Sequence, residues 1–362
     1  MAQTPAGQAG EVMMMQNIAV MGAGSWGTTF AQLCCDAANA TTLWSRRQEV
    51  AEEINTTHHL EDYLPGIELP ETLHATADPV RALERADVVV LAIPSVWLAE
   101  QLCGWGQLIP HDATVVSLAK GVEATTLRRA SEVVIETLDC DPQRVAIVSG
   151  PNIASEIAQR LPAATVAACG DEHRATRVQK VCMTPYFRVY TNPDRIGCET
   201  GGATKNVLAI AAGIADGMGL GQNAKATLVT RGLAEMARLG VALGGKPLTF
   251  LGLAGVGDLI VTCSSPKSRN RSVGERLGRG EDLEAIVSGM RMVAEGVKSA
   301  RAILALARRA GVEMPICDAV VKVVHEGLAP SDLVAGLMAR EPKPELHGLP
   351  QHDGALLSDN WP

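Results

Sequence analysis

Short continuous runs of apolar residues recur through the first half of the chain, with longer mixed stretches between them. The runs that predict strands cover residues 18–21, 40–44, 86–93, 113–118, 145–148, 163–168 and 187–190. An apolar run without polar interruption is typical of a strand that is covered on both faces of a parallel sheet. Helical patterns such as residues 28–38 alternate with these runs, so the sequence predicts a doubly wound α/β sheet.

Strand signals are largely lost after about residue 196. Helical patterns cover residues 207–213, 223–243, 283–304 and 318–326, and the segment 252–271, rich in glycine, serine and cations, is expected to form loops. We therefore predict that the second half is all-helical. The expected division is a disordered N-terminus at 1–15, the sheet domain at 16–195, a helical domain at 196–340 and a disordered tail at 341–362.

The first apolar run leads directly into a glycine motif. Gly22, Gly24 and Gly27 follow the run and precede a helical pattern. In a dinucleotide-binding fold the first glycine permits the turn, the second lets the backbone approach a pyrophosphate, and the third lets the helix pack close to the strand. The N-terminus of that helix suits a diphosphate. The sheet domain is thus predicted to be Rossmann-like, although this glycine spacing also occurs in structural turns.

Two arginines follow the second apolar run. In NAD-selective folds this strand usually ends in an acid that binds the ribose 2′-hydroxyl, whereas an arginine accommodates the 2′-phosphate of NADP. Arg46 and Arg47 occupy this place, and the nearest acid, Glu49, falls in the following helical pattern. The sequence favours NADP, or use of both cofactors. The alternative is two solvated arginines at a helix start.

Composition and charge exclude several classes of protein. The net charge of −8 and the lack of a long basic run argue against nucleic acid as a partner. No stretch offers the roughly 20 apolar residues of a membrane span, and the N-terminus lacks the features of a signal peptide. Nine scattered cysteines without metal spacing predict reduced thiols in a cytoplasmic protein. The adjacent pair His58 and His59 does not predict a metal site.

Candidate chemistry lies in two lysines and one polar loop. Lys120 follows the run 113–118, at a strand end where open α/β sheets bind ligands, and Lys205 lies in an almost uncharged helical stretch where burial is expected. The loop 264–271 combines hydroxyls, an amide and cations, which suits a phosphate monoester. The alternatives are surface lysines and a solvated loop. Asn152 is expected to cap a helix N-terminus.

Eight segments together identify a resemblance. They are residues 22–27 (Gly-Ala-Gly-Ser-Trp-Gly), 119–121, 149–151, 201–206 (Gly-Gly-Ala-Thr-Lys-Asn), 230–236, 255–259 (Gly-Val-Gly-Asp-Leu), 268–270 (Ser-Arg-Asn) and 295–296. Over about residues 16–340 the chain resembles the bacterial-type NAD(P)-dependent glycerol-3-phosphate dehydrogenases. The resemblance implies reversible reduction of dihydroxyacetone phosphate to sn-glycerol 3-phosphate with NADPH or NADH, as a supply for phospholipid synthesis.

The resemblance also implies roles for single residues. It makes Lys205 the catalytic residue that donates the proton, so no metal is needed. Cofactor positions would be Gly22, Gly24, Ser25, Trp26, Gly27, Arg46, Arg47, Lys120, Ala154, Arg269, Val293 and Glu295. Substrate positions would be Lys120, Gly150, Asn152, Lys205, Asp258, Ser268, Arg269 and Asn270. Trp26 stands where a smaller aromatic is frequent in the family, and Asn152 stands where Thr or Ser is frequent.

Two other functions stay open at this point. A related β-hydroxyacid dehydrogenase would share both domains and a lysine, but Asp258 and the segment 268–270 argue against it. A non-catalytic NAD(P) sensor would need neither Lys205 nor Asn206 nor Asp258. A homodimer formed through the helical domain is the expected assembly.

Overall fold

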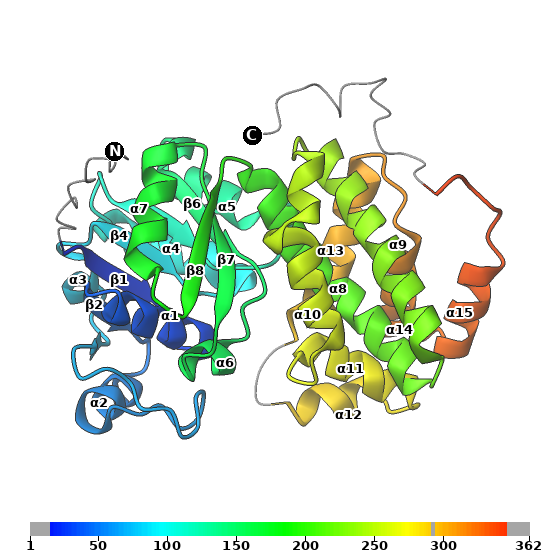
Figure 1. Cartoon of the computed structure of the whole chain (residues 1–362), viewed down its shortest axis with the longest axis horizontal. Helices are drawn as coiled ribbons and strands as arrows, with labels where there is room; N and C mark the ends of the chain where they lie inside the picture. Colours follow the sequence, from blue (N-terminus) through cyan, green and yellow to red (C-terminus); the bar gives the residue numbers. More distant parts are fainter. Residues whose placement is uncertain (1–14, 291–293, 346–362) are drawn as a thin grey trace, which may run out of the picture.

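An eight-stranded sheet forms the first half of the computed structural model, which describes residues 15–290 and 294–345 (Figure 1). The spatial order is β3-β2-β1-β4-β5-β6-β7-β8, and every neighbouring pair is parallel except the antiparallel pair β6 and β7. The strands are β1 (Asn17–Met21), β2 (Ala40–Trp44), β3 (His74–Thr76), β4 (Val88–Leu91), β5 (Thr114–Ser117), β6 (Val145–Ser149), β7 (Ala163–Ala168) and β8 (Phe187–Asn192). The strand order reverses between β1 and β4, and ligands of open α/β sheets bind at such a point.

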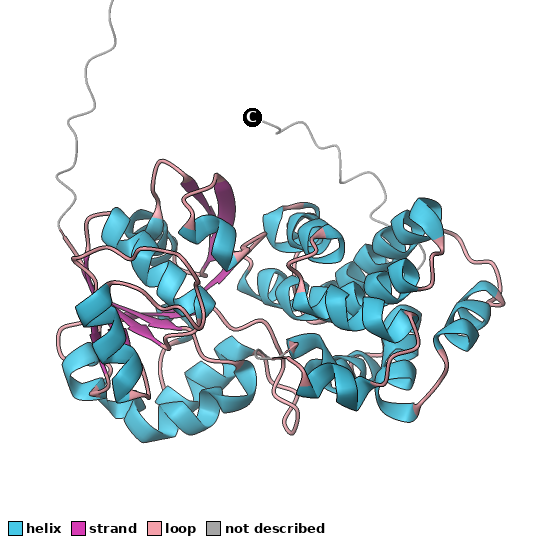
Figure 2. Cartoon of the chain, turned by 90° about the horizontal axis from the view of Figure 1, so that it is seen from below, coloured by secondary structure: helices cyan, strands magenta, loops and turns pink. Residues whose placement is uncertain are grey.

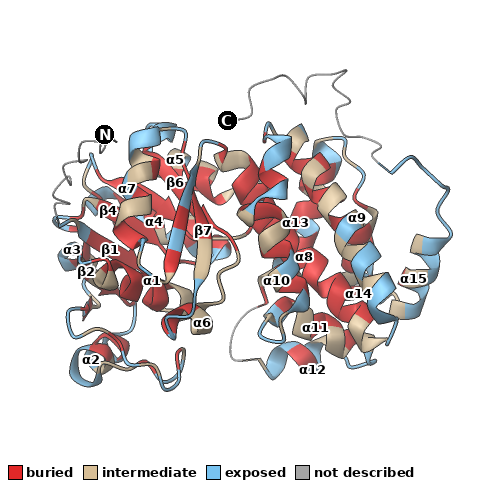
Figure 3. Ribbon diagram, viewed as in Figure 1, coloured by how far each residue is buried: buried red, intermediate tan, exposed pale blue. Residues whose placement is uncertain are grey.

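Helices cover both faces of this sheet. They are α1 (Ser25–Asp36), α2 (Gln48–Thr57), α3 (Pro79–Leu83), α4 (Ser95–Trp105), α5 (Ala130–Leu138), α6 (Ala154–Ala158) and α7 (Glu172–Cys182). In β1, Ile18 and Val20 pack into the core under α1 and α7, while Ala19 and Met21 pack into the core under α4 and α5. Figure 3 shows the resulting burial of the central strands. This two-sided burial explains why the strands have uninterrupted apolar sequences.

A long buried helix, α8 (Arg195–Gly217), organises the second half, where Figure 2 shows only helices and loops in the part that the structure describes. Around it lie α9 (Gly221–Ala242), α10 (Asp258–Ser264), α11 (Arg269–Gly278), α12 (Leu283–Ser288), α13 (Glu295–Arg309), α14 (Pro315–Glu326) and α15 (Pro330–Met338). The backbones of α8 and α11 approach closely. A Cβ at Gly213 would lie 2.0 Å from the carbonyl oxygen of Arg271, and one at Gly274 would lie 2.0 Å from that of Ile210.

The structure corrects several predicted elements. Residues 253–264 are helical, not loop, because a π-helical turn over Leu253–Gly257 runs into α10. The glycines there reflect close packing, since a Cβ at Gly255 would lie 2.2 Å from the carbonyl oxygen of Phe250. The predicted helix 283–304 is divided into α12 and α13, and residues 291–293 lie outside the described part. The edge strand β3 and the helices α11 and α15 were not predicted.

Other expectations concern the termini, the thiols and membranes. Residues 1–14 and 346–362, which carry most of the predicted disorder, lie outside the described residues. All nine cysteines are free thiols. Within residues 15–290 and 294–345, no helix has the length and apolarity to cross a membrane.

Candidate functional site

The glycine motif forms a tight turn between β1 and α1 at the carboxyl edge of the sheet. Gly22 has a φ of +126°, and a Cβ there would lie 2.6 Å from the carbonyl oxygen of Ala92. A Cβ at Gly27 would lie 1.9 Å from the carbonyl oxygen of Gly22, whereas one at Gly24 would meet no atom within 4 Å. Gly24 is also the N-cap of α1, and no side chain caps it. The turn is crowded toward the protein and open beside the helix N-terminus, which fits a bound pyrophosphate.

A loop after α2 closes over this turn. The hydroxyl of Ser25 donates to the carbonyl oxygen of Tyr63 at 2.9 Å, and the guanidinium of Arg47 lies over the Tyr63 ring, 5.9 Å from its centroid. Arg47 also lies 3.8 Å from the carboxylate of Glu49. Arg46 is exposed and pairs with no acid among the described residues. Arg46 is therefore the arginine that is more available to a 2′-phosphate.

The two lysines meet at one buried carboxylate. The ammonium of Lys120, which follows β5, donates to Oδ2 of Asp258 at 2.7 Å and to the carbonyl oxygen of Gly150 at 3.0 Å. The ammonium of Lys205, on α8, donates to Oδ1 of Asp258 and to Oγ1 of Thr262 at 2.9 Å. Asp258 has no exposed surface, and Lys205 is 7% exposed. Two positive charges share one negative charge, so the cluster can accept further negative charge from a ligand.

The charge state of Lys205 is set by opposing effects. The pKa of Lys205 is lowered to about 8: burial is the largest cause, the charge of Asp258 opposes it, and the charge of Lys120 adds to the lowering. A lysine with a pKa near neutral pH can both donate and accept a proton, which is what general acid–base catalysis requires. Thr262 keeps the amine in place, because its hydroxyl donates to the carbonyl oxygen of Asp258 at 2.6 Å and accepts from Lys205.

A chain of amides joins three helices beside the lysines. Asn206 donates from Nδ2 to the carbonyl oxygen of Lys120 at 3.3 Å. Asn270 donates to Oδ1 of Asn206 at 3.0 Å and accepts from the backbone N–H of Gly296 at 2.9 Å. The side chain of Asn270 thus holds α8, α11 and α13 together. Both polar atoms of its amide are therefore engaged within the protein.

The predicted phosphate loop forms the start of α11. Ser268 is the N-cap, and its hydroxyl accepts from the backbone N–H of Arg271 at 3.3 Å. Arg269 is the exposed first residue of the helix. Glu295, the first residue of α13, is close enough that Arg269, Lys120 and Lys205 all oppose the rise in its pKa that burial causes. The predicted residue Val293 lies outside the described part of the chain.

The loop after β6 completes the wall of the site. Gly150 adopts a φ of +157°, and a Cβ there would lie 3.0 Å from the Cα of Thr165. The prediction that Asn152 caps α6 is wrong: Ile153 is the N-cap, and Asn152 donates to Oγ1 of Thr165 at 2.9 Å. The carbonyl oxygen of Ala154 accepts from Thr29 of α1 at 3.4 Å, so this loop lies against the glycine-turn helix.

Sequence reasoning missed three residues of this region. Tyr63 and Thr262 make the contacts described above, and Trp97, at the start of α4 beyond the carboxyl end of β4, is 53% exposed. An exposed tryptophan beside a cofactor crevice offers a stacking surface. Only Trp97 had a visible signal, as an aromatic residue just after a strand that ends in proline. Trp26 is half-buried, and its ring lies edge-on to Phe30 with 5.8 Å between the centroids.

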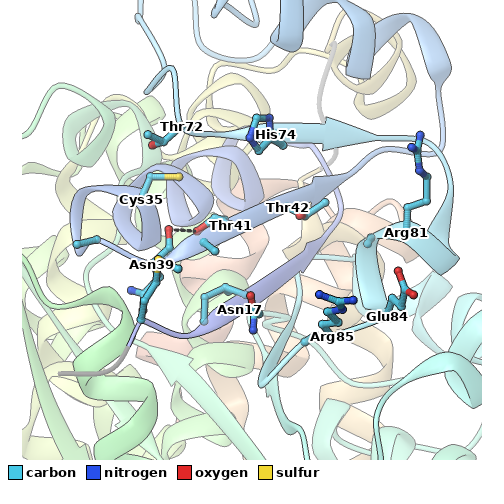
Figure 4. Close-up of a pocket in the computed structure, with 16 residues that line it drawn as sticks. Asn17, Cys35, Asn39, Thr41, Thr42, Thr72, His74, Arg81, Glu84 and Arg85 are labelled. Atoms are coloured by element: carbon cyan, nitrogen blue, oxygen red, sulfur yellow. Dashed lines mark hydrogen bonds between the residues drawn. The ribbon is translucent and has the colours of Figure 1, made fainter. Parts of the chain in front are cut away.

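A cavity of about 400 Å³ lies elsewhere, at the amino ends of β1, β2 and β3 (Figure 4). Its polar wall includes Asn17, Thr42, His74, Arg81 and Arg85. None of the predicted site residues that the structure describes lines it. In open α/β sheets ligands bind at the carboxyl edge, so this cavity is not the cofactor crevice. The structure also brings no three metal-ligating side chains together within the described residues.

Comparison with known proteins gives the same family for both halves. A family model described as NAD-dependent glycerol-3-phosphate dehydrogenase N-terminus matches residues 17–175, and one described as the C-terminus of that enzyme matches residues 194–335. A glycerol-3-phosphate dehydrogenase (NAD(P)+) from Corynebacterium glutamicum is 56% identical over 332 residues, which are 91% of this chain and 100% of the relative. One from Streptomyces griseus is 55% identical over 327 residues, 90% of this chain and 97% of the relative.

A solved structure is also similar to the chain. The crystal structure of glycerol-3-phosphate dehydrogenase from Coxiella burnetii superposes with a TM-score of 0.86 at 37% identity. The match covers 90% of this chain and 99% of that one.

Proposed function

The chain belongs to the NAD-dependent glycerol-3-phosphate dehydrogenase family, and on this premise we propose that its lysine cluster reduces a phosphorylated ketone. The reaction is the reversible NAD(P)H-dependent reduction of dihydroxyacetone phosphate to sn-glycerol 3-phosphate. The observation that carries the assignment is the buried ammonium of Lys205, held by Asp258 and Thr262 where the sheet domain meets the helical domain.

Lys205 acts on the ketone oxygen. The nicotinamide cofactor, when bound, supplies a hydride to the carbonyl carbon. The Lys205 ammonium donates a hydrogen bond to the carbonyl oxygen, stabilises the negative charge that develops there, and transfers its proton. In the reverse direction neutral Lys205 accepts the hydroxyl proton. Asp258 orients the Lys205 ammonium and favours its charged form, because the Asp258 carboxylate accepts hydrogen bonds from both Lys205 and Lys120.

The remaining substrate contacts are proposed for side chains around this pair. Lys120 and Arg269 supply positive charge to the phosphate, and the guanidinium can bind it at two points. Ser268 and Asn270 place the N-terminal turn of α11, whose N–H groups suit an anion. Gly150 and Asn152 form the wall opposite α8, where the carbonyl oxygen of Gly150 fixes Lys120.

We propose the cofactor site at the carboxyl edge, between β1 and β4, with NADP favoured over NAD. The glycine turn with Ser25 and Trp26 holds the pyrophosphate, Arg46 and Arg47 bind the 2′-phosphate, and Lys120, Ala154, Arg269 and Glu295 line the nicotinamide side. The open space beside Gly24 and the exposed guanidinium of Arg46 support this placement. Val293 is included on the resemblance alone.

The assembly, compartment and cellular role are also proposals. A homodimer through the helical domain is supported by apolar side chains that this domain leaves exposed, namely Leu248, Leu251 and Ile260. The nine free thiols suit the reducing cytoplasm. There the product would supply phospholipid synthesis. The proposed domains are 16–195 and 196–340, and this boundary lies within one residue of the start of α8 at Arg195.

The test of the function is turnover with matched substrates. NADPH oxidation is measured with dihydroxyacetone phosphate and, in parallel, with unphosphorylated dihydroxyacetone. We expect rapid turnover of the phosphorylated ketone alone. Measurable NADPH binding without turnover of either ketone would instead favour a sensor, and activity on an unphosphorylated hydroxyacid would favour the β-hydroxyacid dehydrogenases.

A further inference from the structure

Glu199, a buried residue of α8, contacts the sheet domain away from the lysine cluster. Glu199 lies six residues before Lys205 and is 7% exposed. Its carboxylate accepts from the backbone N–H of Ser131 at 2.8 Å and from the Ser131 hydroxyl at 2.6 Å. It also lies 3.5 Å from the guanidinium of Arg129. Glu199 therefore binds the first turn of α5, which belongs to the sheet domain.

The segment that Glu199 anchors is the one that carries Lys120. Arg129 pairs with Val122 in an isolated β-bridge, and the N–H of Glu123 donates to the carbonyl oxygen of Arg128 at 2.9 Å. The two ends of the loop 122–129 therefore lie side by side, and the loop begins two residues after Lys120. A displacement of Arg129 would be passed to Val122 through the bridge, and Val122 is two residues from Lys120.

The same loop is held by the helical domain at further points. Val122 is buried in the helical-domain core, Leu127 packs against that core, and Arg309 of α13 donates to the carbonyl oxygen of Thr126 at 3.4 Å. Asn206 of α8 binds the carbonyl oxygen of Lys120 itself. Helix α8 therefore holds the segment 120–131 at both ends, through Asn206 and through Glu199.

Glu199 is a buried carboxylate that satisfies a backbone N–H at the start of α5 and also pairs with Arg129. Burial raises the pKa of Glu199, while Arg129 and Ser131 act in the opposite direction. Burying a carboxylate is costly even when it is paired, and an apolar contact could have joined α5 to α8 without that cost. A charged, three-point contact instead fixes the position of the loop relative to the helix that carries Lys205.

We propose that Glu199 is a positioning residue, which acts through the loop 122–129 to place Lys120 against Asp258. This inference rests on the proposed function, because the consequence for catalysis follows from the role of Lys120. The loop 122–129 does not hold the Lys205 amine directly, because the hydrogen-bond partners of that amine, Asp258 and Thr262, both belong to α10.

The first test does not depend on activity. The reactivity of the Lys120 amine toward acetic anhydride is measured by peptide mass spectrometry in the wild type, in Glu199→Gln and in the control Glu132→Gln. Glu132 binds Arg129 within the first turn of α5 itself and makes no hydrogen bond or ion pair with α8 among the described residues. We expect Lys120, now 13% exposed at its side chain, to react several times faster in Glu199→Gln alone. Equal labelling in all three proteins would overturn the proposal.

The second test is a double-mutant cycle on the specificity constant for dihydroxyacetone phosphate. We expect Glu199→Gln to lower kcat/KM by about tenfold in the wild type and to have little effect in Lys120→Ala, since residues coupled through a shared backbone shift show coupling of this size. The dissociation constant for NADPH should not change. If Glu199 has only a general structural role, Glu199→Gln should lower kcat/KM by the same factor in the wild type and in Lys120→Ala. That result would contradict the proposal.

Further variants keep both tests decisive. If Glu199→Gln does not fold, Ser131→Ala serves instead, because it removes one hydrogen bond to Glu199 and leaves the ion pair between Glu199 and Arg129 in place. In that variant we expect a smaller increase in the labelling of Lys120 and a smaller coupling to Lys120→Ala. If the wild type does not turn over dihydroxyacetone phosphate, the proposed function fails, but the labelling result still decides whether Glu199 positions Lys120.

Discussion

At the scale of single residues, the central feature is a lysine that burial and charge influence in opposite directions. The pKa of Lys205 is lowered to about 8, with burial as the largest cause and the charge of Asp258 opposing it. Below this pH the amine carries the proton that ketone reduction needs, and above it the proton is lost. We expect kcat/KM for reduction to be level below about pH 8 and to fall by about tenfold per pH unit above it. A pH–rate profile with a level region through pH 10 would contradict this.

Oxidation should show the opposite dependence. Neutral Lys205 is the base in that direction, so kcat/KM for sn-glycerol 3-phosphate should rise as the pH passes the same value. The variant Asp258→Asn removes the charge that raises the pKa of Lys205. The descending limb of the reduction profile should therefore move to lower pH, and a limb that stays in place would show that Asp258 does not influence the lysine.

The two arginines after β2 predict a difference in cofactor use. Arg46→Asp should weaken NADPH binding far more than NADH binding, because the new carboxylate repels a 2′-phosphate and can accept from a 2′-hydroxyl. Dissociation constants from fluorescence titration give the comparison. Arg85→Asp, which alters an exposed arginine at the opposite edge of the sheet, is the charge-matched control. Equal changes for both cofactors in Arg46→Asp would exclude a role in binding the 2′-phosphate.

At the scale of elements, the contact between α8 and α11 depends on glycine. Gly274→Ala places a Cβ 2.0 Å from the carbonyl oxygen of Ile210, and overpacking of this kind costs about 1–3 kcal/mol. A Cβ at Gly336 of α15 would meet no atom within 4 Å, so Gly336→Ala should be neutral or stabilise by up to about 1 kcal/mol. Urea unfolding of both variants tests the difference. An unchanged midpoint for Gly274→Ala would contradict the packing argument.

Sequence reasoning predicted most of the strands. β7 matches its predicted bounds, and β1, β2 and β4–β8 were all predicted. The central strands β4, β5 and β6 are buried along their whole length and have clear apolar runs, whereas the edge strand β8 is buried at alternate positions and was predicted from Phe187, Val189 and Tyr190. α10 was missed because the glycines before it resemble a loop, although Gly255 is there for close packing. β3 was missed because a three-residue edge strand has too few positions to form a pattern.

At the scale of the whole molecule, the proposed site draws its residues from both the sheet domain and the helical domain. Lys120 and Gly150 come from the carboxyl edge of the sheet, while Lys205, Asp258 and Asn270 come from three helices of the second domain. The sequence predicted that Lys120 follows a strand end and that Lys205 lies in a buried helical stretch. It could not indicate that the carboxylate of Asp258 binds both. Contacts such as Lys120–Asp258 join residues 138 positions apart and depend on how the domains meet. Local patterns carry no information about that arrangement, and the role of Glu199 was hidden for the same reason.

The central claim is that the Lys205 ammonium is the proton donor, and Lys205→Met tests it most directly. The change keeps the length of the side chain and removes its charge. We expect kcat for dihydroxyacetone phosphate to fall by roughly 10² to 10⁴-fold, the usual loss for a proton-transfer group, with the dissociation constant for NADPH unchanged. A variant that binds NADPH normally and keeps kcat within a few-fold of the wild type would contradict the account.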